Sequence, residues 1–557
     1  MYLRFHVLKA KEFKPVVAKE KNMLDLRPAI IAKLQQLVKD GSNGLYILNI
    51  DKINPDVINS KLDVVNASLH IDTAVMRSLD KVQKLPEDIF NIKFNTLHID
   101  GIGIDNFLHK DKIDVSGIFI SRPVIEMYHN DRPYNKEERQ KKENLSLYKR
   151  ILGTMKSIAL GKVSIQQGTF VLHQHEKNSR NLKLNDVGIN LNKILIDSTT
   201  QFDHDRFLFA KTANFSAKNY FLPTPDSLYV FSVGSINISA DQHSLTAGSV
   251  QLKAKGGKKE FLRKIKERKE LYDLTIPKIT LNGVNWLAIL NNEKFLMKNL
   301  DLFNPAFSVY LDRSIPQGKT IEKNSFPHQL LLKFKVPIEI AKLNLHNLKI
   351  RYDEFSPAIN RTAGATFDRI NGQITNISNL PGEISKHPIA VADVKGIFEH
   401  TTPAMAKFQF FLNKPASGDF IADVQMDTLN NYTVNPISEP LALFTVKRGQ
   451  LQKGKAHVEG NIGGAKASVE LEYTKLHITP LKPDSGKDGK LKEKHITSFL
   501  ANKLLIKDNN PGNNGELRKP EYTVVRDHHG NFFNFIWVSI LTGMLKTIGI
   551  PVKFVLH

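Results

Sequence analysis

The chain contains no cysteine, which excludes disulfide bonds, thiolate chemistry and cysteine-ligated zinc. The absence of thiols is compatible with an oxidising compartment. Tryptophan is scarce, with 2 residues in 557. No stretch reaches the roughly 18 uncharged apolar residues of a membrane-spanning helix. Charges interrupt the N-terminal run MYLRFHVLKAKEFK, so we expect no signal peptide there.

Sequence patterns of catalysis are also lacking. Gly318, Lys319 and Thr320 match the end of a phosphate-binding loop, but Arg313 stands where its first glycine belongs. Possible metal ligands are isolated, and no spacing completes a site around them: His173 and His175, Asp203 with His204 and Asp205, and His528 and His529 beside Asp527. We therefore predict a protein that is not an enzyme and that uses no metal or other cofactor.

The charge balance is strongly basic. The chain has 78 Lys and Arg against 56 Asp and Glu, a net charge of +22. Such a charge favours nucleic acid or anionic lipid as a partner, unless it is simply a solvated basic surface. Helix-turn-helix, zinc-ligand and aromatic RNP-type patterns are missing, so a nucleic-acid-binding protein is the weakest alternative and we predict no nucleic-acid partner.

Alternating apolar and polar residues are what the chain does have, and Leu343–Asp353 (LNLHNLKIRYD) shows the pattern best. Period-two alternation places apolar side chains on one face of a sheet. Asn347 interrupts the alternation and tolerates a left-handed or bulged backbone. We predict two strand segments joined by a bend, so that Leu343, Leu345, Leu348, Ile350 and Tyr352 do not all share one face.

The same pattern recurs along most of the chain. Its copies are Leu62–Asp72, Leu97–Asp105, Val163–Leu172, Leu182–Leu191, Ile279–Leu287 and Leu300–Tyr310. Their irregular spacing argues against a solenoid or propeller of fixed period. The predicted fold is mainly β: an elongated, curved, largely antiparallel β-groove built from repeated hairpins, with a few short capping or peripheral helices.

Six segments and six helices are expected. The segments are an N-terminal lead-in and helix (1–41), a first β segment (42–134), a charged linker and helix (135–160), a middle β segment (161–326), a C-terminal β segment (327–480), and a loop, strands and hydrophobic helix (481–557). Five of the helices are Leu24–Val38, Ala74–Val82, Leu145–Ile158, Gly256–Asp273 and Phe532–Leu545. The sixth is expected within His495–Ile506, where a strand follows it.

Two of these helices admit a membrane interpretation. Gly256–Asp273 is the most basic stretch, but its apolar stripe is narrow, which favours a crossover helix capping the sheet over a membrane-surface helix. Phe532–Leu545 carries no charge and is too short to span a bilayer. It suits either an interfacial helix or a helix covering an open end of the sheet.

Asp427–Ile478 resembles the C-terminal region of AsmA-like proteins of Gram-negative bacteria. The matching elements are Asn435-Pro436, Gly449, Leu451 with Gly454, Gly460-Asn461, Gly463-Gly464 and the closing Leu471, Tyr473, Leu476 and Ile478. Ser42–Ile53 with Asp72-Thr73, and the close from Tyr522 to Gly549, are similar to large uncharacterised members. Family members usually begin with a membrane-anchoring helix, and none is visible near Met1.

The resemblance implies a periplasmic, membrane-associated cell-envelope protein, distantly related to bridge-like lipid-transfer proteins. It implies partners among membrane lipids, whose phospholipid acyl chains an apolar groove would shield or transfer, and a role in outer-membrane or envelope organisation. A scaffold acting through protein partners is the alternative. The family carries no catalytic residues to transfer.

The candidate site residues follow from the apolar positions. The predicted groove lining comprises Leu97, Ile99, Val163, Ile165, Ile279, Leu281, Leu300, Leu302, Leu343 and Leu345. The predicted membrane contacts of the C-terminal tail are Phe532, Phe533, Phe535, Trp537, Ile540 and Leu541.

Overall fold

The computed structural model of the chain describes most of the sequence. The residues described are 25–109, 112–130, 132, 134, 157–174, 182–200, 203, 206–286, 288–289, 294–318, 325–484, 490–493, 507–550 and 552. The predicted lead-in, the charge run at 135–144, the predicted helix His495–Ile506 and most of the predicted helix Leu145–Ile158 lie outside these ranges.

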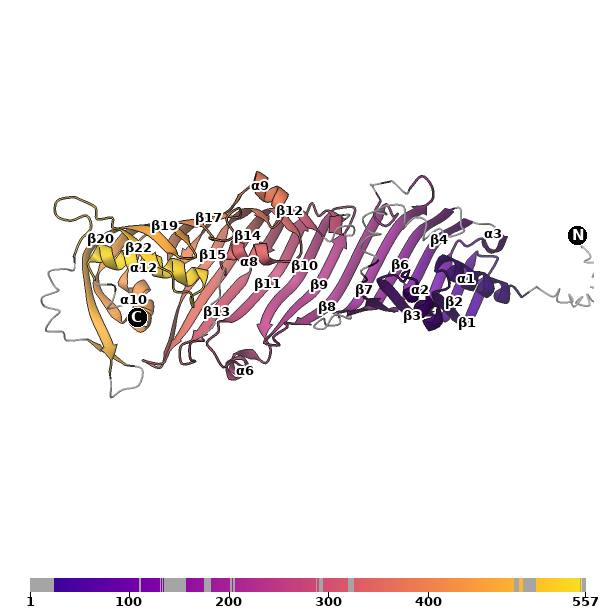
Figure 1. The fold of residues 1–557 in the computed structure, drawn as a ribbon, viewed down its shortest axis with the longest axis horizontal. Helices are drawn as coiled ribbons and strands as arrows, with labels where there is room; N and C mark the ends of the chain where they lie inside the picture. The colour runs from indigo at the N-terminus through magenta and orange to yellow at the C-terminus, as the bar shows by residue number, and fades with distance from the viewer. Residues whose placement is uncertain are drawn as a thin grey trace, which may run out of the picture.

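The fold is mainly β, as predicted: 22 strands form one large, mostly antiparallel sheet in an elongated molecule (Figure 1). The strands are β1 (Tyr46–Asp56), β2 (Lys61–Ile71), β3 (Asp88–Asp100), β4 (Lys112–Ser121), β5 (Val124–His129), β6 (Ser157–Gln174), β7 (Leu182–Ile196), β8 (Thr212–Pro223), β9 (Tyr229–Ser239), β10 (Ser244–Ala254), β11 (Leu271–Asn282), β12 (Phe295–Phe303), β13 (Ala306–Asp312), β14 (Ile338–Ser356), β15 (Arg361–Ser378), β16 (Ile389–Phe398), β17 (Thr402–Phe411), β18 (Phe420–Met426), β19 (Phe444–Asn461), β20 (Gly464–Pro483), β21 (Leu491–Glu493) and β22 (Glu521–Val525).

The helices are short and lie at the ends and edges of the sheet (Figure 1). They are α1 (Arg27–Gly41), α2 (Thr73–Lys81), α3 (Ile104–His109), α6 (Gly257–Lys264), α8 (Pro327–Lys333), α9 (Pro381–Lys386), α10 (Asn431–Ala442) and α12 (Phe532–Ile548). Three predicted helices therefore form within a few residues of their expected bounds, as α1, α2 and α12. The predicted helix Gly256–Asp273 is too long: α6 ends at Lys264, and Leu271 already belongs to β11.

Parallel pairing occurs at two places, each built on a broken strand. β4 and β5 both pair with β3 on one side and with β6, in parallel, on the other. β12 and β13 pair in the same manner with β11 and β14. Arg122 and Asn304 stand at the two breaks, each with positive φ and each followed by proline. One sheet thus runs through the expected segment boundaries near 135–160 and 326.

Each copy of the repeated pattern contains a residue with positive φ at the position that interrupts its alternation. These residues are Asn66, Gly101, Gln167, Asp186, Gly283, Asn304 and Asn347. Glycine and asparagine tolerate this conformation best, which explains their use at these positions. The predicted left-handed or bulged backbone is therefore confirmed at Asn347, where φ is 58°.

The predicted separation of faces at Asn347 is wrong. β14 is a single strand through this residue, and the register shifts between Leu345 and Leu348. These two residues, three positions apart on β14, pair with Gly372 and Ile370, which are two positions apart on β15. The bulge absorbs one residue, so the apolar side chains on both sides of it share one face.

Candidate functional site

One row of directly paired residues crosses the sheet from β1 to β22, and every member is apolar. Residues paired directly across strands have side chains on the same face. We call this set the apolar row: Ile53, Val64, Leu97, Ile120, Ile165, Ile189, Phe215, Ile238, Leu245, Leu281, Leu300, Leu343, Ile374, Ala392, Phe408, Ala422, Val458, Ala467 and Tyr522.

All ten predicted lining residues lie on this face of the sheet. Five belong to the apolar row itself: Leu97, Ile165, Leu281, Leu300 and Leu343. Ile279, Leu302 and Leu345 form a second run of direct partners beside it. Ile99 and Val163 are joined through Ile118 on the other side. The structure thus brings the ten together on one surface, while their contact with lipid stays a prediction.

Burial varies along the apolar row. Ile53 and Val64 at one end are buried, and so are Ala422, Val458 and the other members from there to β22. Every member from Leu97 to Ile374 keeps part of its surface accessible. The row therefore has two covered ends and a partly covered middle stretch.

Helices cover the N-terminal end. Ile30 of α1 is fully buried among Ile53, Leu62 and Val64, and Phe107 of α3 joins the same cluster. In the middle stretch, the segment after β11 contributes Val284, Trp286 and Ile289 against Leu281, Leu300 and Leu343. This cover is narrow. On either side of it, the apolar side chains of neighbouring strands pack mainly against each other.

Helix α12 covers the C-terminal end. The side chain of Asn531 caps the helix by accepting a hydrogen bond from the backbone N–H of Asn534 at 2.8 Å. The Tyr522 hydroxyl donates to the Ser539 carbonyl at 2.7 Å. Gly543 lets the helix approach the sheet, because a Cβ there would lie 2.2 Å from Tyr522 Oη and 2.4 Å from Val469.

The predicted membrane contacts divide between the two faces of α12. Phe532 and Phe535 are buried against the sheet, Ile540 packs partly against the same cluster, and Leu541 is buried as well. The three buried residues are therefore covered by protein, and their contact with a membrane stays an untested prediction. Phe533 and Trp537, one turn apart, are 60% and 47% exposed and form the outer face.

The opposite face of the sheet is polar. Its central row of direct partners comprises Thr280, Asp301, Asn344, Gln373, Asp393, Lys407, Asp423 and His457. Asn344 Nδ2 donates to Asp301 Oδ1 at 3.0 Å. Hydrogen bonding to Asp423, at 2.6 Å, raises the pKa of His457. Partly exposed pairs of this kind stabilise a sheet by about 1 kcal/mol or less each.

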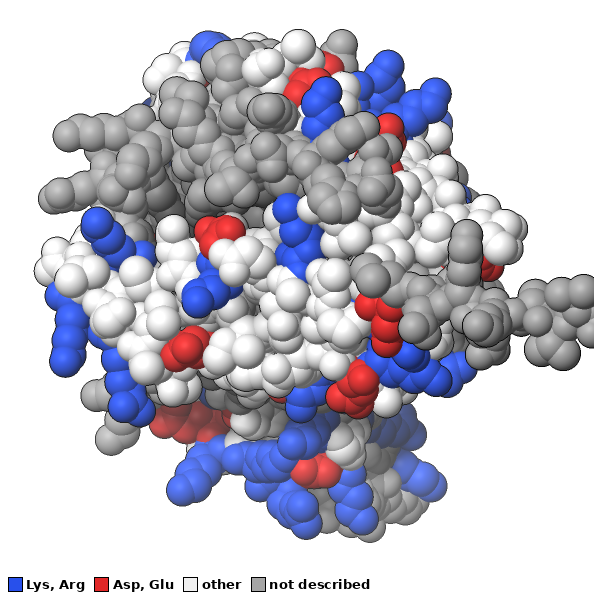
Figure 2. Space-filling view, turned by 90° about the vertical axis from the view of Figure 1, so that its right-hand side faces the viewer, with Lys and Arg blue, Asp and Glu red and all other residues white. Residues whose placement is uncertain are grey.

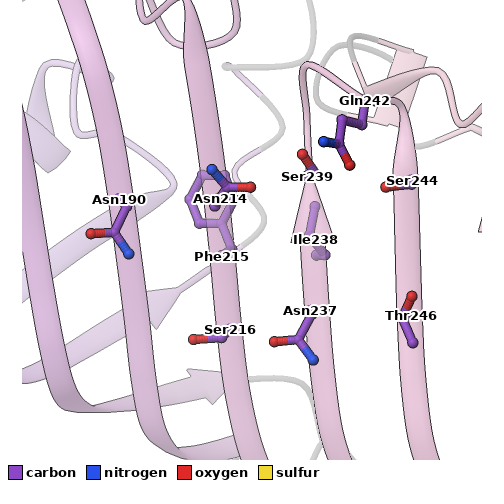
Figure 3. A pocket seen from close by; sticks show the side chains of 10 residues that line it. All are labelled: Asn190, Asn214, Phe215, Ser216, Asn237, Ile238, Ser239, Gln242, Ser244 and Thr246. Carbon is purple, nitrogen blue, oxygen red and sulfur yellow. The ribbon is translucent and has the colours of Figure 1, made fainter.

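A shallow pocket lies on the polar face across β7 to β10 (Figure 3). Its volume is about 360 Å³, and amide and hydroxyl side chains such as Asn190, Asn214, Asn237 and Thr246 line it. None of the lining residues is acidic, basic or a histidine. The pocket therefore offers no general acid or base and no strong metal ligand.

The basic helix α6 lies at one edge of the sheet. Phe261 is buried against Tyr229 and Leu271, and Lys258 lies over the ring of Tyr310. Lys259, Arg263 and Lys264 are exposed. Figure 2 shows Lys and Arg side chains gathered at the lower rim of the molecule, the side on which Figure 1 places α6. The prediction of a helix capping strand ends is confirmed for Gly257–Lys264.

The candidate metal ligands are not brought together in the part of the chain that the structure describes. His173 stacks on Tyr128, with ring centroids 4.6 Å apart, and Nε2 lies 3.6 Å from Glu126. His175, His204 and Asp205 lie outside the described residues. Asp527 accepts a hydrogen bond from the backbone N–H of His529. The described residues contain no group of three or more metal-binding side chains.

Comparison of the sequence with known proteins does not assign the chain to a family. No protein-family model matches the chain, and no curated protein matches it. Among the described helices, none is both long and apolar enough to cross a membrane.

Six residues of the middle stretch were not among the predicted lining: Ile120, Ile189, Phe215, Ile238, Leu245 and Ile374. Their strands alternate as clearly as the named repeats, so the signal was present in the sequence. Their alignment with the predicted lining depends on strand register, which alternation alone does not specify.

Proposed function

We propose that this chain is a non-enzymatic lipid-handling protein of the cell envelope, whose apolar face shields acyl chains. The observation that carries the proposal is the apolar row, which is continuous across the sheet and partly accessible from Leu97 to Ile374. An accessible apolar face on a sheet whose opposite face is polar indicates a binding site for an apolar ligand.

Physical chemistry supports an acyl chain as that ligand. Burial of each methylene contributes about 0.8 kcal/mol relative to water, so contact with several strands offsets the cost of taking an acyl chain out of a bilayer. The row contains aliphatic and aromatic side chains only, so its contacts tolerate different chain types. The resemblance to AsmA-like proteins supports the envelope location and the shielding or transfer of phospholipid chains.

The test is lipid co-purification, with a matched control on the same strand. Ile279→Lys with Leu281→Lys places two charges on the apolar face of β11. Thr280→Lys with Asn282→Lys places the same charges on its polar face. We expect mass spectrometry to find bound lipid with the unchanged chain and with the control, and none with the Ile279 and Leu281 variant.

Circular dichroism completes this experiment. The proposal requires both variants to retain their β-sheet spectrum, because Ile279 and Leu281 keep part of their surface accessible beside the narrow cover of Val284, Trp286 and Ile289. If the Ile279 and Leu281 variant unfolds while the control stays folded, those residues belong to a closed core and the proposal loses its main support.

The outer face of α12 is the part of the tail that we propose as a membrane contact. Deleting the helix would also uncover Phe420 and Tyr473, so point substitutions are the sharper test. We expect Phe533→Ser with Trp537→Ser to reduce binding to anionic vesicles in a flotation assay without lowering the melting temperature. Unchanged flotation would leave α12 as a cap alone.

A further inference from the structure

Arg526 follows β22 directly and is buried, with 3% of its surface exposed. Its Nη2 donates one hydrogen bond, to Ser325 Oγ at 2.9 Å. Nε and Nη1 are both buried and have no hydrogen-bond partner. Among the described residues, no carboxylate lies within ion-pair distance of it.

The guanidinium lies over the ring of Phe326, 4.2 Å from its centroid. Phe326 packs in turn against Phe420 and Phe532, with ring centroids 5.5 and 5.2 Å apart. These rings belong to the cluster that contains the last members of the apolar row, including Val458. Arg526 therefore places a cation at the C-terminal end of the apolar row.

The neighbouring charges do not neutralise this cation. Asp527 is exposed and already accepts a hydrogen bond from the His529 backbone. His328 lies beyond Phe326 with both ring nitrogens unpartnered, and burial lowers its pKa to about 4, so it is neutral at pH 7. Burial likewise lowers the pKa of Arg526, against a weaker opposing effect of Asp527.

A buried charge without a counter-ion is costly, and proteins keep such groups paired. Buried polar groups without partners require an explanation, of which an ion absent from the structure is one. Arginine is suited to phosphate and carboxylate, because its N–H groups form strong charge-assisted hydrogen bonds with them.

We propose that Arg526 is an anion-binding residue that receives the phosphate or carboxylate headgroup of an amphiphile whose hydrocarbon lies along the apolar row. The hydrocarbon part of this inference rests on the proposed function. Nε and Nη1 have no accessible surface here, so side chains around the guanidinium must move when the anion binds. The anion then supplies the hydrogen bonds that the guanidinium lacks.

The experiment measures binding of three probes to the full chain: dodecyl phosphate and dodecyl maltoside, both below their micelle concentrations, and inorganic phosphate. We expect dodecyl phosphate to bind at least tenfold more tightly than dodecyl maltoside. Arg526→Leu and Arg526→Gln are expected to abolish this preference while leaving dodecyl maltoside binding unchanged. Arg361→Leu removes an exposed arginine at the start of β15 and serves as the control, which retains the preference.

The melting temperature separates this role from a structural one. Removal of an unpaired buried charge predicts that Arg526→Leu melts at or above the temperature of the unchanged chain. An unfolded Arg526→Leu protein, or an Arg526→Gln protein with full preference for dodecyl phosphate, would overturn the proposal. If inorganic phosphate binds as tightly as dodecyl phosphate, the ligand is a free oxyanion and the headgroup assignment is overturned. If the unchanged chain binds neither amphiphile, the proposed function itself fails.

Discussion

The C-terminal end and the middle of the apolar row have the same side-chain chemistry and different surroundings. At the C-terminal end, α12 and the first residues of α8 cover the row, and Phe420, Val458 and Tyr473 are almost completely buried. In the middle, Phe215 and Ile238 pair with each other and stay partly accessible. Alternation decides which face is apolar, whereas the cover decides whether that face is a core or a surface.

The comparison predicts a large difference between two phenylalanines. Phe420→Ala is expected to destabilise the protein by about 3–5 kcal/mol, because it leaves a cavity among buried rings. Phe215→Ala is expected to cost only about 1 kcal/mol, because its ring is partly in contact with water in the folded state. Denaturant titration followed by circular dichroism measures both values. Equal losses would show that the middle is as closed as the end.

Low pH is expected to affect the two regions differently, because the buried His328 lies at the covered C-terminal end. Its ordinary pKa is 6.5, and burial lowers its pKa to about 4 in the folded protein. The unfolded chain therefore binds the proton first, and stability falls as pH drops from 6.5 to 4, by about 3 kcal/mol in total. Two charged groups face this ring cluster: Asp419 acts electrostatically on His328, and Arg526 lies over the ring of Phe326.

His328→Phe tests this pH dependence directly. We expect the difference in melting temperature between pH 7.5 and pH 4.5 to be smaller in this variant than in the unchanged chain. Titration of exposed carboxylates affects both proteins equally and cancels in the comparison. An identical pH dependence in the two proteins would place the acid-sensitive group elsewhere.

An effect smaller than those at Phe420 and His328 is expected in the middle stretch, at the bulge of β14. Asn347→Val places a β-branched residue at φ 58°, which is expected to cost about 1–2 kcal/mol. Asn347→Gly is the matched control, because glycine adopts this conformation without strain. Hydrogen exchange is expected to rise in β14 and β15 only, with α12 unaffected. Faster exchange in α12 as well would show that the two regions unfold together.

Much of this architecture is predictable from the sequence, and the reasons for the failures are physical. Alternation identifies the strands, and the residues that interrupt it, such as Asn347, identify the bulges. Side-chain direction beyond a bulge depends on how many residues of the partner strand pair with the bulged segment. That information lies in β15, at Gly372 and Ile370, and not in β14.

The C-terminal helix shows a second kind of failure. Its residues are apolar on almost every side, and a helix of that composition is usually buried. This signal favours a cap, which describes the buried face of α12. The aromatic residues favour a membrane interface, which stays a proposal for the exposed Phe533 and Trp537. The distinction between Phe532 and Phe533 depends on Phe326 and Phe420, which are more than a hundred residues away in the sequence.

The register of the apolar row also sets a length. Neighbouring strands lie about 4.8 Å apart, so a row that crosses the sheet from β1 to β22 extends on the order of 85 Å. This is nearly three times the roughly 30 Å hydrocarbon thickness of a bilayer. Because each added hairpin extends the row by about 10 Å without altering its cross-section, a gain or loss of hairpins would change the reach of the molecule while preserving its surface chemistry.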